Sequence, residues 1–359
     1  MLFFRNLFFA SSDGVTVTPR RLKTKRKKHF ARCSKTRPCN GVVIIFIFAI
    51  TMTTSMANLQ TVARCAQCGE GGNGGEGGAG LKTCKSCKHI KYCSVMCQRL
   101  NWPSHKKECK RRAAQLHDES LFKQPPPKDD CPICFLPMPS AEMGLTGFYH
   151  CCGKTVCNGC GYNSTLSGSR KCPFCNANVG MEDEIILEQM MKRVEANDAD
   201  SMTELGKSYA YGRIGLQQDW NKAFGLWTRA AELGSSTAHY SLGGVYYEGM
   251  GKEKDMMKAI HHSELAAMAG HDLARFQLGW IEFKSGNTER AIKHWTISAS
   301  AGHSQSMTDI KQSFERVDGG FHAPEGVEND VYELTLKAYN DSCAEMWSKA
   351  REDAATKMW

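Results

Sequence analysis

The spacing of the cysteines constrains this chain more than any other feature of its sequence. Fifteen of the 18 cysteines lie between Cys65 and Cys175. Many form Cys-x-x-Cys pairs, whose short spacing lets two thiolates hold one tetrahedral zinc ion. Disulfides are the alternative for clustered cysteines, but the helical repeats that follow favour a reducing compartment. The segment therefore predicts two small zinc-binding modules.

The first group of cysteines also contains a histidine at a ligand-like spacing. Seven thiols and one imidazole are enough to hold two zinc ions with four ligands each. The same stretch contains Tyr92, Gln98, Trp102 and Lys106. With these features, residues 65–109 resemble the MYND zinc finger at all eight ligand positions.

This resemblance implies that the ligands of the first module interleave along the chain. One zinc would be held by Cys65, Cys68, Cys93 and Cys97. The other would be held by Cys84, Cys87, His105 and Cys109. The glycine-rich spacer between the first two pairs is longer than this family usually carries, and we expect it to behave as a flexible coil.

The second group begins with Cys131-Pro132-Ile133-Cys134 and ends with Cys172-Pro173-Phe174-Cys175. In this respect residues 131–175 resemble a RING finger. The resemblance implies that one zinc is held by Cys131, Cys134, Cys157 and Cys160. The other would be held by Cys172, Cys175 and a ligand pair from the middle of the module.

The middle ligand pair departs from the RING pattern. A RING finger has a histidine where this chain has Lys154, and a lysine ammonium has no lone pair for a metal. Cys151 and Cys152 together would complete the ligands, whereas His150 with Cys152 is the alternative. Thiolates predominate in structural zinc sites, which favours the cysteine pair.

The formal net charge of +9 belongs to the first 64 residues. These residues carry 12 Lys/Arg and one Asp, whereas the rest of the chain carries 34 Lys/Arg and 36 Asp/Glu. The basic run over 20–29 is typical of a nuclear-import signal or an anion-binding arm, and a merely solvated run is the simpler interpretation. Nucleic-acid binding is therefore not expected outside this tail.

An apolar run, Val42–Ile50, follows the basic run. It is too short for a membrane-spanning helix, which needs about 20 residues. The positive-inside rule would also place the zinc modules in an oxidising lumen, so we favour a cytoplasmic or nuclear protein without a membrane span. A secretory signal is the alternative, although its n-region would be unusually long. The simplest explanation is translation from Met52 or Met56, which makes residues 1–64 a disordered tail or a gene-model artefact.

A linker is expected over residues 110–130, between the two modules. It passes from a basic, helix-like stretch over 110–114 to Pro125-Pro126-Pro127. Consecutive prolines stiffen a chain, so this segment predicts a semi-rigid spacer.

From residue 182 onward, the apolar pattern has the period of a helix, and a longer repeat is superimposed on it. Leu-Gly pairs recur at intervals of 37 and 36 residues, at Leu205-Gly206, Leu242-Gly243 and Leu278-Gly279. Each unit closes with a glycine, at Gly234, Gly270 and Gly302. An equivalent place within the units is occupied by Trp227, Ser263 and Trp295. A period near that of tetratricopeptide units predicts paired helices stacked into a solenoid.

These units resemble Sel-one-like repeats, whose Leu-Gly-x-x-Tyr-x-x-Gly pattern is visible in the first two units. The third unit departs from the pattern at Glu282 and Ser285. We assign residues 182–310 to the repeats and residues 311–359 to a C-terminal capping region. The whole chain is predicted to be mainly α-helical, a helical-repeat solenoid preceded by two small cross-braced zinc-binding modules.

No enzyme constellation stands out in the sequence. It contains no nucleophile elbow, no dinucleotide fingerprint after a strand and no metal motif with an open position. We therefore assign no catalytic residue and no cofactor other than zinc. The first hypothesis is a zinc-binding adaptor whose finger and solenoid bind protein partners, the finger through short peptide motifs.

The second hypothesis is a RING-type ubiquitin ligase that recruits substrates through the repeats or the finger. The RING resemblance implies a docking face for a ubiquitin-conjugating enzyme, and Ile133 and Pro173 match apolar positions of that face. Asn176 stands where active RING fingers often have a basic residue. An amide cannot supply the forked, charged hydrogen bonds of a guanidinium, which weakens this hypothesis.

Overall fold

A computed structural model describes most of the chain beyond the tail. The described residues are 64–70, 80–143, 146–168, 170–179, 182–315 and 321–357. The basic run, the apolar run and the alternative start sites lie outside them. Among the described residues, no helix combines the length and the apolar character that crossing a membrane requires.

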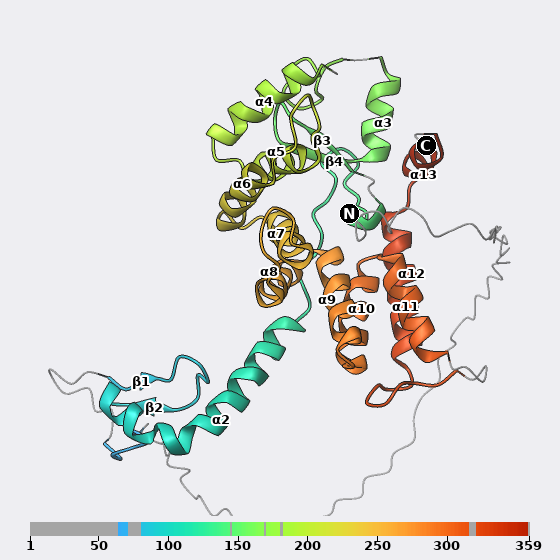
Figure 1. Cartoon of the computed structure of the whole chain (residues 1–359). Coiled ribbons are helices and arrows are strands. Elements are labelled where there is room, and N and C mark those ends of the chain that lie inside the picture. Colours follow the sequence, from blue (N-terminus) through green and yellow to red (C-terminus); the bar gives the residue numbers. More distant parts are fainter. Residues whose placement is uncertain are drawn as a thin grey trace, which may run out of the picture. The chain divides into compact units, whose positions relative to one another are not determined.

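The structure is mainly α-helical, which confirms the predicted fold class (Figure 1). Its helices, with one short 3-10 turn, are α2 Val95–Leu121, η1 Ala141–Met143, α3 Asn158–Leu166, α4 Asp183–Glu195, α5 Ala199–Tyr211, α6 Trp220–Glu232, α7 Ser236–Glu248, α8 Met256–Met268, α9 Asp272–Lys284, α10 Thr288–Ser300, α11 Ser304–Phe314, α12 Val331–Met346 and α13 Lys349–Lys357. Its strands are β1 Lys82–Thr83, β2 Lys91–Tyr92, β3 Thr146–Tyr149 and β4 Lys154–Cys157.

The first module consists of the β1–β2 hairpin and the start of α2. The strands are antiparallel, with Lys82 opposite Tyr92. The side chain of Ser94 accepts a hydrogen bond from the N–H of Cys97 and so caps the helix. The helix then continues for 27 residues. The boundary drawn between residues 109 and 110 therefore falls inside a helix that ends only at Leu121.

The second module consists of the antiparallel β3–β4 hairpin followed directly by α3. Thr146 lies opposite Cys157 and Tyr149 opposite Lys154. Cys157 is the last residue of β4 and also the N-cap of α3. The hairpin and the helix thus bring cysteines from separate parts of the module toward each other.

Three helix pairs, α5–α6, α7–α8 and α9–α10, pack on one another in chain order (Figure 1). Each pair ends in the same tight turn, which the first illustrates. Gly234 has φ of 91°, and its N–H bonds to the carbonyl of Ala231 while that of Ser235 bonds to Ala230. The side chain of Ser235 then caps α7 by accepting a hydrogen bond from the N–H of Ala238. This left-handed ending, which glycine favours, explains why each unit closes with a glycine.

The recurring Leu-Gly pair lets a side chain of the following helix approach the helix backbone closely. A Cβ added at Gly206 would lie 2.5 Å from Nε1 of Trp227. At Gly279 the added atom would overlap Trp295, and at Gly243 it would lie 2.8 Å from Oγ of Ser263. Both indoles are buried and pack in the core of the repeats.

The segment predicted to be a spacer lies against the repeats. The Arg275 guanidinium in α9 donates to the carbonyl oxygen of Leu121 at 2.6 Å. Lys128 pairs with Asp272 at 3.0 Å, at the start of α9. The Glu142 carboxylate accepts from the backbone N–H of Ser304 at 2.7 Å, at the start of α11. Side chains in the first turn of α9 therefore hold this segment by charge and hydrogen bonds, and the start of α11 holds Glu142 of the second module.

Beyond α11, the described residues of the predicted capping region, 311–359, form two helices, α12 and α13. Helix α12 packs against α10 and α11. Helix α13 packs against α3 of the second module. The last helix thus contacts a part of the chain far away in the sequence.

Candidate metal centres

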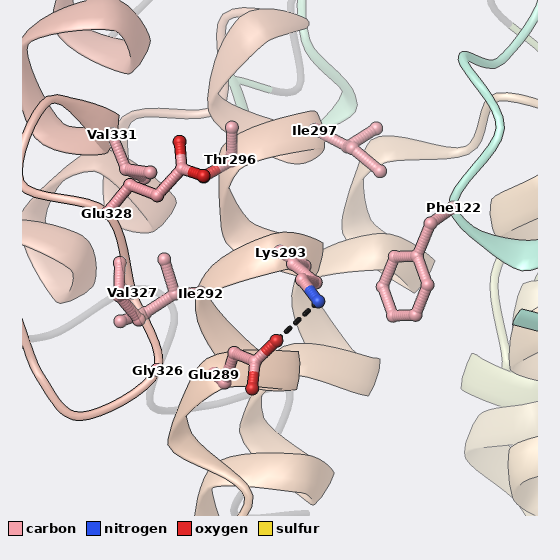
Figure 2. Close-up of a pocket in the computed structure, with 10 residues that line it drawn as sticks. All are labelled: Phe122, Glu289, Ile292, Lys293, Thr296, Ile297, Gly326, Val327, Glu328 and Val331. Carbon is pink, nitrogen blue, oxygen red and sulfur yellow. Dashed lines mark hydrogen bonds and ion pairs between the residues drawn. The ribbon is translucent and has the colours of Figure 1, made fainter.

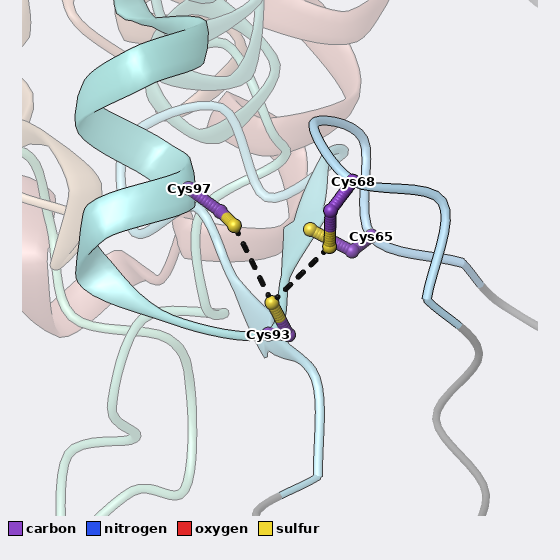
Figure 3. Close-up of side chains that lie close together, drawn as sticks. All are labelled: Cys65, Cys68, Cys93 and Cys97. Carbon is purple, nitrogen blue, oxygen red and sulfur yellow. Dashed lines mark hydrogen bonds between the residues drawn. The ribbon is translucent and has the colours of Figure 1, made fainter.

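The first cysteine cluster lies between the start of the chain's described part and the first turn of α2. Its members are Cys65, Cys68, Cys93 and Cys97, whose Sγ atoms all lie within 4.8 Å of one another. Figure 3 shows these sulfur atoms converging, with Cys93 Sγ at 3.5 Å from both Cys68 Sγ and Cys97 Sγ. Thiolates at about 2.3 Å from a tetrahedral zinc are separated by about 3.8 Å. The cluster therefore fits one zinc ion.

The second cluster consists of Cys84, Cys87, His105 and Cys109, which are all buried. Its Cys84 and Cys109 sulfur atoms are 3.7 Å apart. The Nε2 atom of His105 lies 3.6 Å from Cys87 Sγ, so this nitrogen faces the thiols. His105 and Cys109 project from the same face of α2, four residues apart. The ligands predicted for the first module are thus grouped in the interleaved manner that its resemblance implies.

The third cluster consists of Cys131, Cys134, Cys157 and Cys160 in the second module. Cys134 Sγ and Cys157 Sγ are 3.8 Å apart. The backbone N–H of Cys157 donates to Cys131 Sγ at 3.4 Å. The hairpin and α3 therefore supply one half of this cluster, and the opening Cys-x-x-Cys pair supplies the other half.

The fourth cluster contains both adjacent cysteines, Cys151 and Cys152, together with Cys172 and Cys175. The tight turn at Gly153 explains how two neighbours reach one centre. The N–H groups of Cys152 and Gly153 both bond to the carbonyl of Tyr149. Sulfur separations are 3.6 Å for Cys152 with Cys172 and 3.5 Å for Cys151 with Cys175.

The histidine alternative for this centre does not lie in the cluster. His150 instead packs edge-on against Phe148, with ring centroids 5.3 Å apart. Its Nδ1 atom is buried and has no hydrogen-bond partner among the described residues. Lys154 lies in β4 and is exposed. The geometry of the described residues thus favours the adjacent cysteines over His150.

A local feature that the sequence reasoning missed recurs at four Cys-x-x-Cys pairs. The residue after the second cysteine has a positive φ at Gly69, Lys88, Phe135 and Asn176. In each case its N–H bonds to the carbonyl of the first cysteine, for example Asn176 to Cys172 at 3.0 Å. Only Gly69 and Asn176 are residue types that commonly adopt this conformation. Lys88 and Phe135 carry no such sequence signal.

These tight turns aim backbone N–H groups at the first sulfur of each pair. Hydrogen bonds from the N–H groups of Cys68 and Cys93 lower the pKa of the Cys65 thiol to about 6. At Cys131, burial raises the pKa, but N–H bonds from Cys134 and Cys157 outweigh it and lower the pKa to about 6. Thiolates are the form that binds zinc, so the turns prepare the clusters for a metal.

A cation is needed to keep all four sulfur atoms of a cluster charged. Hydrogen bonds with Cys97 and Cys68 raise the pKa of the Cys93 thiol to about 12, because neighbouring thiols compete for the protons. A divalent cation at the centre removes this competition by accepting a lone pair from every sulfur. The donor set of three or four sulfurs is typical of structural zinc sites.

A pocket of about 510 Å³ lies beside α10, and Phe122 together with residues of the 326–331 segment completes its lining (Figure 2). Phe122, Ile292 and Val327 form apolar parts of its wall. The Lys293 ammonium pairs with Glu289 at 2.5 Å. Apolar walls with one ion pair suit contact with an apolar side chain.

Two family models match parts of this chain. The model described as MYND finger matches residues 65–109. Residues 65–109 form a MYND finger. The MYND finger is a zinc-binding domain, and its clusters are positioned to bind metal. The model described as Sel1 repeat matches residues 199–235, 236–271 and 273–303, so three Sel1 repeats follow the finger. Neither match covers residues 131–175.

Curated relatives match only a part of the chain. Chitin synthase regulatory factor 4 of Schizosaccharomyces pombe is 27% identical over 133 residues, which are 37% of this chain and 21% of the relative. The putative sel1-like repeat-containing protein L21 of Acanthamoeba polyphaga mimivirus is 31% identical over 135 residues, 37% of this chain and 24% of the relative. The chain thus spans about a fifth to a quarter of these relatives.

Among solved structures, the chain is similar to a Sel1 repeat protein from Oxalobacter formigenes. The identity is 25%, the TM-score is 0.37, and the match covers 46% of this chain and 65% of that protein. A protective antigen with an SLR fold, c5321 of uropathogenic Escherichia coli, is 23% identical with the same TM-score. That match covers 48% of this chain and 35% of the antigen.

Proposed function

We propose that this protein is a zinc-dependent adaptor that brings protein partners together through its MYND finger and its Sel1 repeats. Four structural zinc ions hold its two zinc modules in shape. The proposed ligands are Cys65, Cys68, Cys84, Cys87, Cys93, Cys97, His105, Cys109, Cys131, Cys134, Cys151, Cys152, Cys157, Cys160, Cys172 and Cys175. No ligand set includes a position left open for a substrate, which is typical of structural zinc.

An exposed apolar surface on the MYND finger carries this proposal. It lies on the first two turns of α2 and comprises Val95, Met96, Leu100 and Trp102, which are all exposed. Met96 and Leu100 are four residues apart and therefore share one face of the helix. Several large apolar side chains exposed over two helical turns are typical of a protein contact. Arg99, Lys106 and Lys107 are exposed on the same helix, which favours an apolar peptide with acidic flanks.

We expect selection from a random peptide library on immobilised full-length protein to enrich short apolar peptides. The double variant Met96→Asp/Leu100→Asp should lose this enrichment, because both side chains, 67% and 61% exposed, would become charged. The variant Met257→Asp is the matched control, since this methionine is 78% exposed on α8, outside the proposed surface. Enrichment that survives in the double variant would contradict the proposed surface.

A second candidate is the RING-type ubiquitin ligase, and the exposure of Ile133 favours it. This side chain lies between the first two cysteines of the second module and is 37% exposed. The position of Asn176 weakens the candidate. The φ of Asn176 is 59°, a value that asparagine adopts more readily than most residues. This residue therefore serves the backbone turn, at the position where active RING fingers often have a basic side chain.

We therefore expect little autoubiquitination by the full-length protein with a panel of ubiquitin-conjugating enzymes. Asn176→Arg would supply the missing guanidinium, at a conformational cost of about 1–2 kcal/mol for a residue in the left-handed region. Activity that appears only in Asn176→Arg would support a docking-competent module. Robust wild-type chains that vanish in Ile133→Ala would overturn the adaptor proposal in favour of a ligase.

A further inference from the structure

We infer that α13 is part of the second zinc module and that Arg351 on this helix stabilises its third cysteine cluster. The inference rests on the proposed zinc ion at that cluster. It joins the end of the chain to a module more than 170 residues earlier in the sequence. Zinc retention at this centre would then depend on the docking of the last helix.

The Arg351 side chain is buried against the opening turn of the second module. It is 5% exposed. Its Nη1 atom donates to the carbonyl oxygens of Pro137 at 2.8 Å and Met346 at 2.7 Å. Its Nη2 atom donates to the carbonyl oxygen of Leu136 at 3.3 Å and to Cys134 Sγ at 3.6 Å. The guanidinium thus bridges α13, the end of α12 and a cluster sulfur.

The backbones of α13 and α3 also meet directly. A Cβ added at Gly159, between two cluster cysteines, would lie 2.7 Å from the backbone nitrogen of Arg351 and 2.8 Å from the carbonyl carbon of Ala350. Ala354, one turn further along α13, is fully buried. Such close packing holds Arg351 beside the sulfur, so the contact does not depend on one flexible side chain.

The charge of the cluster explains why a guanidinium belongs there. Four thiolates around one Zn²⁺ carry a net charge of −2, and burial makes that charge costly. A buried cation beside the sulfur offsets part of the charge, and its charge-assisted hydrogen bond to Cys134 Sγ holds this ligand in place. Groups that hold metal ligands in this way change metal affinity by about 10- to 100-fold when they are mutated.

Zinc release from the full-length protein to a competing metallochromic chelator tests the inference. We expect Arg351→Gln to release one zinc per chain about 10- to 100-fold faster than wild type, while the other zinc ions leave at the wild-type rate. Arg351→Lys should be intermediate, because an ammonium keeps the charge but not the forked geometry. Lys349→Ala is the control, since this side chain is 79% exposed on the same helix.

A second variant covers the outcome in which Arg351→Gln misfolds. Gly159→Ala leaves the guanidinium in place but forces α3 and α13 apart, so it should also accelerate the release of one zinc. Wild-type release rates in either a folded Arg351→Gln or Gly159→Ala would overturn the inference. A wild-type protein without zinc at the second module would instead refute the proposed centre itself, so the two failures are distinguishable.

Discussion

Removing zinc with a chelator is expected to unfold the MYND finger and the second module while most of the repeat helices remain folded. The buried core of the finger consists of Cys65, Cys84, Cys87, Tyr92 and Cys109, so nearly all of it is ligand. Structural zinc contributes about 10–16 kcal/mol of apparent binding free energy in zinc-finger peptides, which such a core cannot replace. Circular dichroism of the full-length protein, with and without chelator, measures the helix that remains.

The repeats have their own apolar core. It includes Met202, Leu205, Trp227 and Leu242, and none of these residues is a proposed ligand. Helical repeats are stabilised by contacts with their neighbours. Retention of most of the helical signal is therefore the expected result, whereas its complete loss would mean that the zinc modules and the repeats fold only as one unit.

A ligand substitution should remove one of the four proposed zinc sites. Cys84→Ser is expected to abolish one zinc site of the MYND finger, because the seryl hydroxyl is a poor substitute for a thiolate. Cys343→Ser is the matched control, since this free cysteine lies on α12 outside the four clusters. Loss of zinc from Cys343→Ser would contradict the ligand assignment.

Gly279→Ala is expected to destabilise the repeats strongly. The added methyl group would overlap the indole of Trp295, which is almost fully buried and also donates from Nε1 to the carbonyl oxygen of Phe276. Overpacking of this kind costs about 1–3 kcal/mol and occasionally more. Urea denaturation followed by circular dichroism measures the change in the free energy of unfolding.

Two other glycines complete the comparison. Gly243→Ala should cost less than Gly279→Ala, because the new methyl group meets the small side chain of Ser263. Gly225→Ala, on the exposed face of α6, has nothing within 4 Å of the added atom. It should raise the stability by about 0.5–1 kcal/mol, since alanine is the better helix former. Equal changes in the free energy of unfolding at all three positions would show that the close approach of the indoles does not require the glycines of the Leu-Gly pairs.

The repeats could be predicted from the sequence because their contacts are local. Each Leu-Gly pair meets a residue of the next helix, and the two partners lie close in the sequence, 21 residues apart for Gly206 and Trp227, 20 for Gly243 and Ser263, and 16 for Gly279 and Trp295. The four clusters could be predicted for a similar reason, since each joins two short ligand segments. Most of these are Cys-x-x-Cys or Cys-x-x-x-Cys pairs, whereas the second cluster uses His105 with Cys109 and the fourth uses the adjacent Cys151 and Cys152. Spacing left Cys151 and His150 as alternatives. The turn at Gly153, closed by its backbone hydrogen bonds, brings Cys151 into the cluster and leaves His150 outside it.

The contacts of the linker and of the last helix could not be predicted. Arg351 meets Cys134 across more than 200 residues, and a single arginine in a polar helix forms no pattern. The same holds for Glu142, whose carboxylate meets the start of α11. Both contacts depend on the placement of already folded modules, which neither helical period nor ligand spacing encodes.

Native mass spectrometry of the full-length protein tests the central claim most directly, because it counts the zinc ions bound to each chain. The structure and the proposed ligands predict four zinc ions per chain, two in the MYND finger and two in the second module. A count of two, with both ions lost on substitution of MYND-finger cysteines, would contradict the account by leaving residues 131–175 without metal.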